Sequence, residues 1–350
     1  AELGLAHARV NVLKADGGTM LLAHARKRPV ESIFSGPAAS VMGIVALCDI
    51  FHDSIILDVG GTTTDIAIFA SGAPLVEGEG IAIGSHPTLV RALKVHSIGI
   101  GGDSAISVIG DDVRVGPLRK GPSMAMGGAH PTLTDAMNHL EVAEVGDVAA
   151  SRAGIARFAE DHTLTPGQLA QDALTAAVEA IHAACREMVA EINAKPVYTI
   201  HELLDGARIV PKKLYVMGGP AEALKMPLFR KFRISTEVPR HARVANAIGA
   251  ALTRLTTDVE LFADTARNVM LIPSLGHREN IPGTYTLADA ERDAMNHLLA
   301  HLGDLGLPGE HKRAEITEAS SLNMVEGLDT VGRNIRVKCQ IKPGVQRLGG

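Results

Sequence analysis

Residues 58–65 read Asp58-Val59-Gly60-Gly61-Thr62-Thr63-Thr64-Asp65 and lie between two apolar runs, 55–57 and 66–69. The runs predict two strands, and the stretch between them predicts the connecting loop. Its glycines permit positive φ and close approach of the backbone, and its threonines offer hydroxyl and backbone donors. The flanking carboxylates could hold a metal ion on bound phosphates through water. We interpret this segment as a phosphate-binding hairpin, with a plain hairpin closed by a Gly-Gly turn as the alternative.

The composition is that of an ordinary α/β protein with a large core. Of the 350 residues 46% are apolar, and this length predicts about two domains. The net charge of -5 and an aromatic content of 3%, without Trp, argue against nucleic acid as a partner. Cys48, Cys185 and Cys339 fit neither a disulfide framework nor a zinc-ligand spacing. Apolar runs long enough to span a bilayer and a signal-peptide pattern are both lacking, so we expect a cytoplasmic protein without a membrane partner.

The apolar pattern of residues 10–255 predicts alternating strands and helices. The longest periodic segment, 165–193, predicts a helix with Thr165 as its N-cap and Pro166 in its first turn. His182 and Cys185 lie on this helix with a spacing that also suits a metal, but we interpret them as packing residues. The other expected elements are strands at 10–14, 95–98 and 213–217, helices at 1–9, 20–28, 38–49, from 221 and at 244–255, and a hairpin over 105–115.

Beyond about residue 256, the pattern of alternating predicted strands and helices ends. Residues 258–272 and 274–283 are mixed in polarity and are expected to be loop-like. Residues 287–302 predict an amphipathic helix, and residues 315–341 predict two strands joined near 326–329. We therefore expect residues 256–350 to form a small α+β module.

Two further glycine loops each follow a predicted strand, at 99–104 and 218–220. With the Gly60 loop, they are what an ATP cleft assembled from separated segments needs. A Rossmann site would need Gly-x-Gly-x-x-Gly opening a helix, and a P-loop would need Gly-Lys-Ser/Thr, so we exclude both. The phosphate hairpin of the actin, Hsp70 and sugar kinase superfamily remains. The run Asp16-Gly17-Gly18-Thr19 echoes the hairpin, but a predicted helix follows it, and we treat the echo as coincidence.

Five motifs follow one another in the chain. They are SGPAASVMG at 35–43, the hairpin at 58–65, HSIGIGGDS at 96–104, VRVGP at 113–117 and PTLTDA at 131–136. In this order they resemble the hydantoinase A/5-oxoprolinase family over roughly residues 14–255. The resemblance implies an α/β actin-like ATPase domain of the ribonuclease H-like class over residues 1–255. It also implies ATP-dependent hydrolysis of a cyclic amide such as a hydantoin or 5-oxoproline; related members are subunits of ATP-dependent ketone carboxylases.

The resemblance implies roles for particular residues as well. Asp58 would lie near Mg²⁺ and its waters, and Gly60–Thr64 would contact the β- and γ-phosphates of ATP. Gly218 and Gly219 would lie against the adenosine, and residues 244–252 would form the closing helix at the domain interface. We select Asp58, Asp65 and His96 as catalytic, Asp58 as metal-binding, and Gly60, Gly61, Thr62, Thr63, Thr64, Gly101, Gly102, Gly218 and Gly219 as cofactor-binding.

Four polar residues near these motifs also have plain structural interpretations. Asp65 could cap the hairpin loop by bonding its backbone N–H groups. His96 is either a substrate-side group or a hydrogen-bonded strand residue. Asp135 fits a helix N-cap at least as well as a catalytic role. For Asn246 we favour support of helix packing over contact with a nucleotide.

The chain departs from the family pattern at several positions. Members carry an earlier Asp-x-Gly-Gly-Thr motif in an N-terminal domain, which residues 1–13 do not supply, so we expect this chain to lack that half of the cleft. Asp103 replaces a third glycine and could repel a phosphate or bind a cation. Lys94 and Met137 replace a common Asp and a common Asn, and we expect both near the substrate, which leaves the substrate class open.

These departures leave three functions open. The first is hydrolysis of a cyclic amide. The second is a nucleotide-binding module or pseudoenzyme, which the changes at Lys94, Asp103 and Met137 favour and the intact hairpin opposes. The third is the ATP-using subunit of a ketone carboxylase-like complex. The resemblance implies a small cyclic amide as the substrate, and it leaves open a second subunit of the hydantoinase B type and a homo-oligomer.

Overall fold

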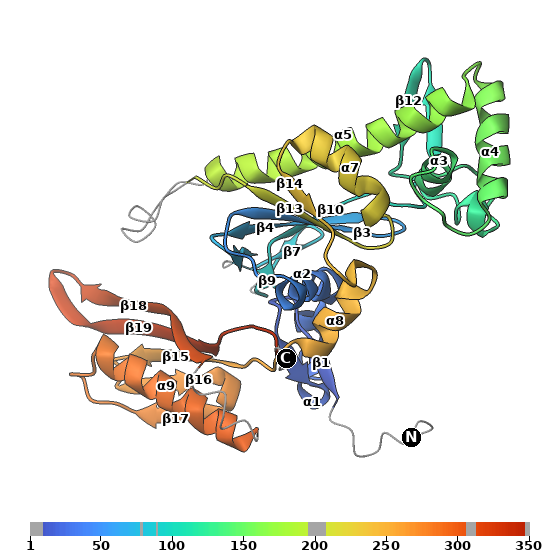
Figure 1. Ribbon diagram of the computed structural model, residues 1–350. Helices are drawn as coiled ribbons and strands as arrows, with labels where there is room; N and C mark the ends of the chain where they lie inside the picture. Colours follow the sequence, from blue (N-terminus) through green and yellow to red (C-terminus); the bar gives the residue numbers. More distant parts are fainter. Residues whose placement is uncertain (1–9, 78–79, 89, 195–207, 306–312, 347–350) are drawn as a thin grey trace. The chain divides into compact units, whose positions relative to one another are not determined.

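The computed structural model describes residues 10–77, 80–88, 90–194, 208–305 and 313–346 (Figure 1). The described residues fall into two compact units. The larger comprises residues 13–17, 29–253 and those from 345, and the smaller comprises residues up to 12, 18–28 and 254–344. The helix expected at 1–9 lies outside the described residues, and the division into domains at 1–255 and 256–350 stays a prediction.

The centre of the larger unit is a sheet with the strand order β10-β4-β3-β13-β14. In chain order these strands are numbers 3, 2, 1, 4 and 5 of the sheet, which is the ribonuclease H-like arrangement. The β3–β4 and β4–β10 pairs are antiparallel, whereas β3–β13 and β13–β14 are parallel. The predicted α/β fold class is therefore confirmed. The strand bounds are β3 Ser54–Val59, β4 Thr64–Ala70, β10 Val95–Ile98, β13 Lys213–Met217 and β14 Ser235–Glu237, and β5 Ala73–Pro74 pairs with β4.

Both faces of this sheet are buried, because alternate residues of a strand point to opposite sides. Leu57 belongs to a core that includes residues of α5 Pro166–Ala194 and α7 Ala221–Phe232. Its neighbour Ile56 belongs to a second core with residues of α2 Ser35–Leu47. The near-continuous apolar run of β3 is thus explained by helices on both sides of the strand.

The helices α2 and α8 Ala245–Leu252 cross at a distance that only glycine permits. A Cβ atom on Gly43 would lie 2.1 Å from the carbonyl oxygen of Ala245, and one on Gly249 would lie 2.0 Å from that of Ala39. Such distances are far inside van der Waals contact, so a side chain at either glycine would force the helices apart. The small residues of these segments therefore set the spacing of the helix pair.

A helical subdomain follows the second glycine loop. It contains the hairpin β11 Ile106–Ile109 and β12 Asp112–Val115, then η2 Met124–Met126, α3 Leu133–His139 and α4 Val148–Asp161. The hydroxyl of Thr165 accepts a bond from the backbone N–H of Gln168, so Thr165 caps α5 as predicted. Short strands elsewhere in the unit are β6 Val76–Glu77, paired with β9 Ala92–Leu93, and β7 Ala82–Ile83, paired with β8 His86–Pro87; η1 Pro29–Ser32 and η3 Ala242–Val244 are single turns.

The helix expected at 20–28 is largely wrong. Residues Thr19–Leu21 form strand β2, which pairs with β1 Asn11–Leu13, and only α1 Leu22–Ala25 is helical. The backbone of Thr19 also exchanges hydrogen bonds with Arg254 and Thr256. Pairing with chain segments far away in sequence therefore overrides the local helical pattern.

The smaller unit is an antiparallel sheet covered by one long helix. The strand order is β17-β16-β15-β19-β18, and α9 Leu287–Asp304 contributes Ala290, Ala294 and Leu298 to the core. The loop-like character expected at 258–283 is wrong. Alternate residues of β15 are buried, and the neighbouring strands are too short for a clear pattern. The strands are β15 Asp258–Asp264, β16 Val269–Ile272, β17 His277–Asn280, β18 Ala314–Glu326 and β19 Asp329–Ile341, with η4 Pro273–Leu275 between β16 and β17.

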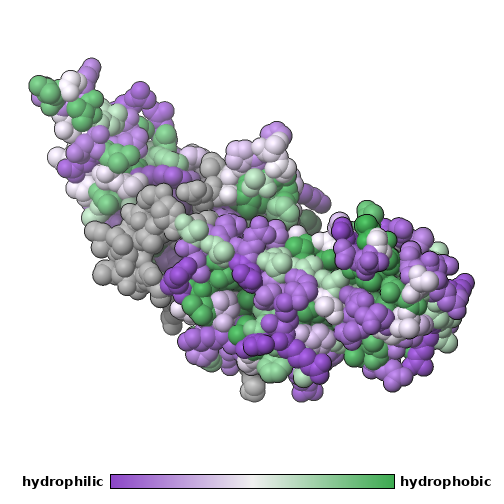
Figure 2. All heavy atoms as spheres, turned by 90° about the horizontal axis from the view of Figure 1, so that it is seen from above, coloured by the Kyte–Doolittle hydropathy of each residue, from purple (hydrophilic) through white to green (hydrophobic). Residues whose placement is uncertain are grey.

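The surface is mixed in polarity on the side that Figure 2 presents. Hydrophilic and hydrophobic residues alternate there in small groups. Within the described residues, no helix has the length and apolar character needed to cross a membrane.

Candidate functional site

The structure brings the three predicted glycine loops together. Gly102 donates a backbone hydrogen bond of 2.9 Å to the carbonyl oxygen of Gly60, and a Cβ atom on Gly101 would lie 2.7 Å from the backbone of Gly61. Gly218 has a φ of +95°, and a Cβ atom there would lie 2.1 Å from the carbonyl oxygen of Val59. The loops after β10 and β13 therefore pack directly on the hairpin, and the glycines are what allows this approach.

The tip of the hairpin is open to solvent. Gly60 donates to the carbonyl oxygen of Thr63 across the turn, and Gly61, Thr62 and Thr63 are exposed. Thr64 differs, because its buried hydroxyl donates a bond of 2.7 Å to the carbonyl oxygen of Ile100. The Thr64 side chain thus ties the hairpin to the second loop, and its selection as a phosphate contact stays a prediction.

Asp58 is the penultimate residue of β3, at the base of the hairpin, and is held by a relay of two side chains. The hydroxyl of Ser40 donates a hydrogen bond of 2.5 Å to Oδ2 of Asp58. The Asn246 amide on α8 in turn donates to Ser40 Oγ at 3.2 Å and to the carbonyl oxygen of Gly36 at 3.3 Å. Asn246 therefore joins α8 to α2, in agreement with the packing role favoured for it. Sequence reasoning missed Ser40, although it lies in the SGPAASVMG motif.

Asp65 lies directly opposite Asp58 in the β3–β4 register. Within the described residues it accepts its hydrogen bond from the hydroxyl of Ser97 on β10, not from N–H groups of the loop it was expected to cap. Burial raises the pKa of Asp65 above its ordinary value, the Ser97 hydrogen bond opposes this, and the charge of Asp58 adds to it. The result is a carboxylate that holds a proton more readily than an ordinary one.

His96 is an exposed residue of β10 beside a cavity of about 330 Å³. Ser97, which bonds Asp65, lines the same cavity. The cavity walls are otherwise mainly apolar, from Phe34, Pro37, Ile81, Ala82, Ala92, Leu93 and Val95, with Gly80 and Glu77 completing them. His96 and Ser97 therefore line one cavity, and Asp65 is linked to it through its hydrogen bond with Ser97.

A second cavity, of about 460 Å³, opens beside Gly218. Its wall runs from Val238 to Val244 and faces Ala221 and Glu222 at the start of α7. Arg240 and Arg243 make the cavity basic, which is suitable for an anionic ligand. Gly219 is exposed next to Gly218.

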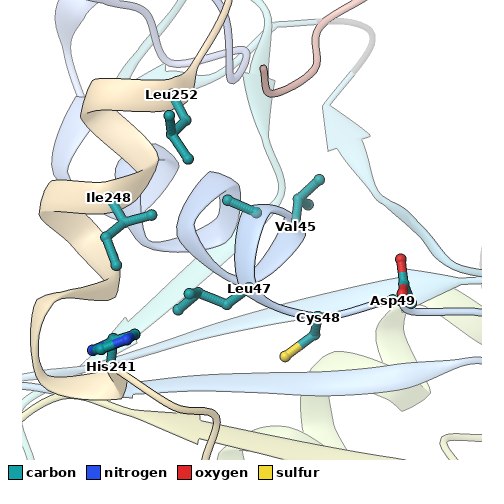
Figure 3. A pocket seen from close by; sticks show the side chains of 8 residues that line it. Val45, Leu47, Cys48, Asp49, His241, Ile248 and Leu252 are labelled. Carbon is teal, nitrogen blue, oxygen red and sulfur yellow. The ribbon is translucent and has the colours of Figure 1, made fainter. Parts of the chain in front are cut away.

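A third cavity, of about 370 Å³, lies between the end of α2 and α8 (Figure 3). Leu47, Ile248 and Leu252 point into the space between the two helices. Burial raises the pKa of the Cys48 thiol in its wall to about 11, so this thiol stays protonated at neutral pH. His241, with a φ of 67°, lines both this cavity and the one beside Gly218.

Comparison with known families identifies the chain. A family model described as hydantoinase/oxoprolinase matches residues 2–259. This chain is a member of the hydantoinase/oxoprolinase family. The resemblance drawn from the five sequence motifs is thereby confirmed.

Two solved structures resemble this family member along almost its whole length. A nucleotide-free structure of acetone carboxylase has a TM-score of 0.68 at 15% identity, covering 97% of this chain and 53% of that one. The ATP-dependent caprolactamase from Pseudomonas jessenii has a TM-score of 0.58 at 17% identity, again covering 97% and 53%. At such identities the likeness shows a shared fold, and this chain spans about half the length of either protein. No curated protein matches its sequence.

The residue that replaces the family's third glycine is paired with a cation. Asp103 accepts a hydrogen bond of 2.8 Å from the guanidinium of Arg119 and one of 3.3 Å from the backbone N–H of Ser123. A Cβ atom on Gly61 would lie 3.2 Å from Oδ2 of Asp103, so this carboxylate lies against the hairpin tip. The ion pair offsets the negative charge that Asp103 brings to the loops.

The other two departures from the family pattern differ in their surroundings. Met137 is buried in the core, and the expectation that it lies near the substrate stays a prediction. Lys94 bridges Glu77 on β6, at 2.5 Å, and Glu191 on α5, at 2.9 Å. Its ion-pair partner Glu77 and its chain neighbours Leu93 and Val95 all line the cavity beside His96.

Asp135 is a structural residue of this family member. Its side chain is completely buried and accepts bonds from the backbone N–H groups of Met124, Ala125 and Thr132. The hydroxyls of Thr132 and Ser151 also donate to it. The N-cap of α3 is Thr132, and Asp135 closes the capping box three residues later. Thr132 and Asp135 together therefore form the helix cap that was expected from Asp135 alone.

Proposed function

We propose that the larger unit binds Mg-ATP and uses it to hydrolyse a cyclic amide such as a hydantoin or 5-oxoproline. The observation that carries this proposal is the packing of three glycine loops around Asp58. Asp58 and Met217 are register partners in the parallel β3–β13 pair, so the loops gather at the carboxyl ends of these strands. In open α/β sheets, ligands bind in crevices at such ends. Membership of the hydantoinase/oxoprolinase family supports this choice.

The residues present fit a nucleotide and a divalent cation. The exposed tip, Gly61–Thr63, offers backbone N–H groups of the kind that bind phosphates. Asp58 offers a carboxylate oxygen, the ligand type that Mg²⁺ prefers, while Ser40 holds the other oxygen. The cavity beside Gly218 would hold the nucleoside, and Arg240 and Arg243 in its wall would attract the negative charge of the phosphates.

The substrate would lie in the cavity beside His96. Bound ATP would supply the activation of the amide oxygen of the ring. Asp65 would then accept a proton from the attacking water, because a carboxylate with a raised pKa is a better base than an ordinary one. Ser97 would orient that carboxylate through its hydrogen bond, and His96 would contact the substrate.

A carboxylase-like function is the second candidate. Acetone carboxylase has the higher TM-score of the two structural neighbours, 0.68 against 0.58. In this role the same ATP site would activate a ketone or bicarbonate, and a second subunit of the hydantoinase B type would complete the reaction. A module that binds the nucleotide without turnover is the remaining alternative. The ion pair between Arg119 and Asp103 argues against it, because it offsets the charge at the changed glycine position.

Calorimetric titration with Mg-ATP, followed by phosphate-release assays, tests the proposal. We expect binding, and release of phosphate that depends on a hydantoin or 5-oxoproline. Asp58→Ala should lower turnover by about 100-fold or more without unfolding the protein. Asp111→Ala, at the exposed tip of the β11–β12 hairpin, is the matched control and should leave turnover unchanged.

Three outcomes separate the candidate functions. Absence of nucleotide binding by a longer protein that also carries the upstream phosphate motif would contradict all of them. Phosphate release that requires a ketone and bicarbonate, with a hydantoinase B-type subunit added, would favour the carboxylase. Binding without turnover on any of these substrates would favour the nucleotide-binding module.

A further inference from the structure

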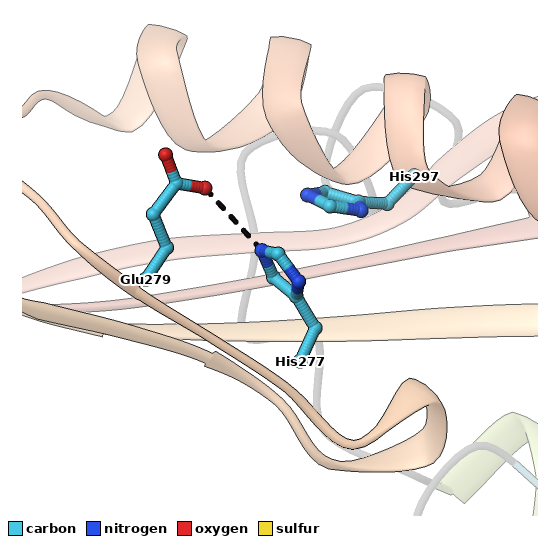
Figure 4. A group of neighbouring side chains, drawn as sticks. All are labelled: His277, Glu279 and His297. Carbon is cyan, nitrogen blue, oxygen red and sulfur yellow. Dashed lines mark hydrogen bonds and ion pairs between the residues drawn. The ribbon is translucent and has the colours of Figure 1, made fainter.

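A cluster of three metal-ligating side chains lies in the smaller unit, outside the proposed ATP site. His277 and Glu279 are two residues apart on β17 and therefore point to the same side of the sheet. His297 reaches them from α9 (Figure 4). One ligand atom from each side chain can be chosen so that all three atoms lie within 4.8 Å of one another.

The distances are close to those of a metal site. In a tetrahedral zinc site with bonds of about 2.0–2.1 Å, neighbouring ligand atoms are about 3.3 Å apart. Nε2 of His277 and Oε2 of Glu279 are already 3.3 Å apart. The rings of His277 and His297 have centroids 4.4 Å apart and are tilted by 49°. Small side-chain rotations would therefore bring the third ligand into place.

Two imidazoles and one carboxylate form a donor set that favours a particular cation. Imidazole suits zinc and other late transition metals, whereas Mg²⁺ and Ca²⁺ prefer oxygen ligands. Two histidines and one glutamate leave the fourth position of a tetrahedral ion open to water. Glu279 has a side-chain exposure of 58%, so an ion could enter from solvent.

A further carboxylate lies beside the cluster. Asp293 lies one helical turn before His297 and is paired with Arg292 at 3.3 Å. Its carboxylate accepts a hydrogen bond from the hydroxyl of Tyr285, which fixes its position.

We propose that His277, Glu279 and His297 bind one Zn²⁺ ion, with water as the fourth ligand. The ion joins β17, the edge strand of the sheet, to α9. β17 is paired only with β16 in the described sheet, and a bond to the helix gives it a second attachment. The proposal does not depend on ATP binding in the larger unit.

A second histidine of α9, His301, supplies the internal control. His301 lies one turn after His297, and its ring stacks on that of His24 with centroids 6.4 Å apart. His301 thus shares the helix, the residue type and partial burial, but it lies outside the cluster. His301→Ala should leave zinc binding unchanged.

The test is calorimetric titration of the whole, EDTA-treated chain with ZnCl₂, and visible absorption with CoCl₂ as a spectroscopic probe. We expect one ion per chain. His277→Ala and His297→Ala should each weaken binding by at least about 10–100-fold, the loss that even outer-shell substitutions cause. A zinc excess of about 100-fold over the Kd should raise the Tm of the unsubstituted chain by about 5 °C.

Several results would overturn the proposal. The first is the absence of stoichiometric zinc binding by the unsubstituted chain. The second is an unchanged zinc affinity in both histidine variants. The third is loss of zinc binding in His301→Ala, which would place the ion at His24. Circular dichroism checks the fold of each variant. If a histidine variant unfolds, Glu279→Gln decides the matter, because this exposed side chain can lose its charge without disturbing the core, and unchanged affinity there would equally contradict the proposal.

Discussion

Ser40, on α2, donates a hydrogen bond of 2.5 Å to the carboxylate of Asp58, at the end of β3. Ser40 is almost completely buried, and its own oxygen accepts a bond from Asn246. One carboxylate oxygen is therefore fixed before any ligand binds. Preorganisation of this kind lowers the cost of placing a metal ligand.

Ser40→Ala should weaken the dependence on Mg²⁺. Without the hydroxyl the Asp58 carboxylate is free to rotate, and we expect a several-fold rise in the Mg²⁺ concentration that gives half-maximal ATP hydrolysis. The free energy of unfolding should fall by about 1 kcal/mol. Mg²⁺ titrations of phosphate release and urea denaturation measure the two effects. Ser32→Ala, at an exposed hydroxyl bonded to Pro29, is the control; equal effects in both variants would contradict the role of Ser40.

Ser97→Ala should move the acid limb of the pH–rate profile to higher pH. Burial is the main cause that raises the pKa of Asp65, and the Ser97 hydrogen bond opposes it, so its loss raises the pKa further. Because the ionised form of Asp65 is the proposed base, activity is present above this pKa and is lost as the pH falls through it. A carboxyl carbon NMR titration of Asp65 gives the same shift without an activity assay. An unchanged pKa would refute the assignment.

Asp65→Asn should separate stability from function. A raised pKa means that the folded state disfavours the ionised form, so this group lowers stability increasingly as the pH rises through the pKa. The amide of this variant cannot ionise, so the variant should have a higher Tm than the unsubstituted chain at pH 7, and this gain should be smaller at pH 3. Turnover should be abolished. Thermal denaturation at both pH values measures the difference. If Asp65→Asn had a lower Tm than the unsubstituted chain at pH 7, the ionised carboxylate would stabilise the fold.

Gly249→Ala should destabilise the larger unit by about 1–3 kcal/mol or more, because the new methyl group would overlap the carbonyl oxygen of Ala39. Gly303→Ala in α9 is the matched control. Nothing lies within 4 Å of its Cβ position, so alanine should gain about 0.5–1 kcal/mol from helix propensity. Denaturation midpoints of both variants test the contrast. Equal values would mean that the helix pair can move apart at no cost.

Arg119→Ala should weaken ATP binding, because Asp103 then places an uncompensated negative charge against the hairpin tip. We expect a loss of several-fold to tenfold, smaller at high salt. The double variant with Asp103→Gly should restore the affinity. Calorimetry with Mg-ATP at two ionic strengths is the measurement. Failure of the double variant to recover would show that Arg119 contacts the nucleotide itself.

The sheet of the larger unit could be predicted from the sequence because its strands are apolar runs that end in glycine loops. The strands at 95–98 and 213–217 have the predicted bounds, and the hairpin around Asp58 is where the pattern placed it. Strands β3, β4 and β13 are largely buried, which produces near-continuous apolar runs that are easy to recognise, whereas β10 carries the exposed His96 and Ser97.

The smaller unit was predicted less well. The residues of β16 and β17 are few, and β17 carries His277, Arg278, Glu279 and Asn280, which have no apolar pattern at all. Only its pairing with β16 makes it a strand. The helix at 20–28 failed for a related reason, since Thr19–Leu21 pairs with another segment.

The sequence indicated that the three glycine loops lie together, whereas the roles selected for individual residues stay predictions. The sequence pointed to Thr64 as a phosphate contact, yet its hydroxyl is used inside the protein, and it did not point to Ser40. Both outcomes depend on which way a side chain faces once the strands have paired. The spacing of residues along the chain does not predict the direction of these side chains.

The relay from Asn246 through Ser40 to Asp58 has a consequence for protein engineering. The side chain that aims the carboxylate sits on a helix whose position is set by the glycine contacts with α8. Any redesign of that helix pair, even for thermostability alone, would also move the Asp58 carboxylate and so change the proposed affinity for Mg²⁺. The same helix contacts determine the stability of the α2–α8 pair and the position of the Asp58 carboxylate. Directed evolution of one property would therefore also change the other.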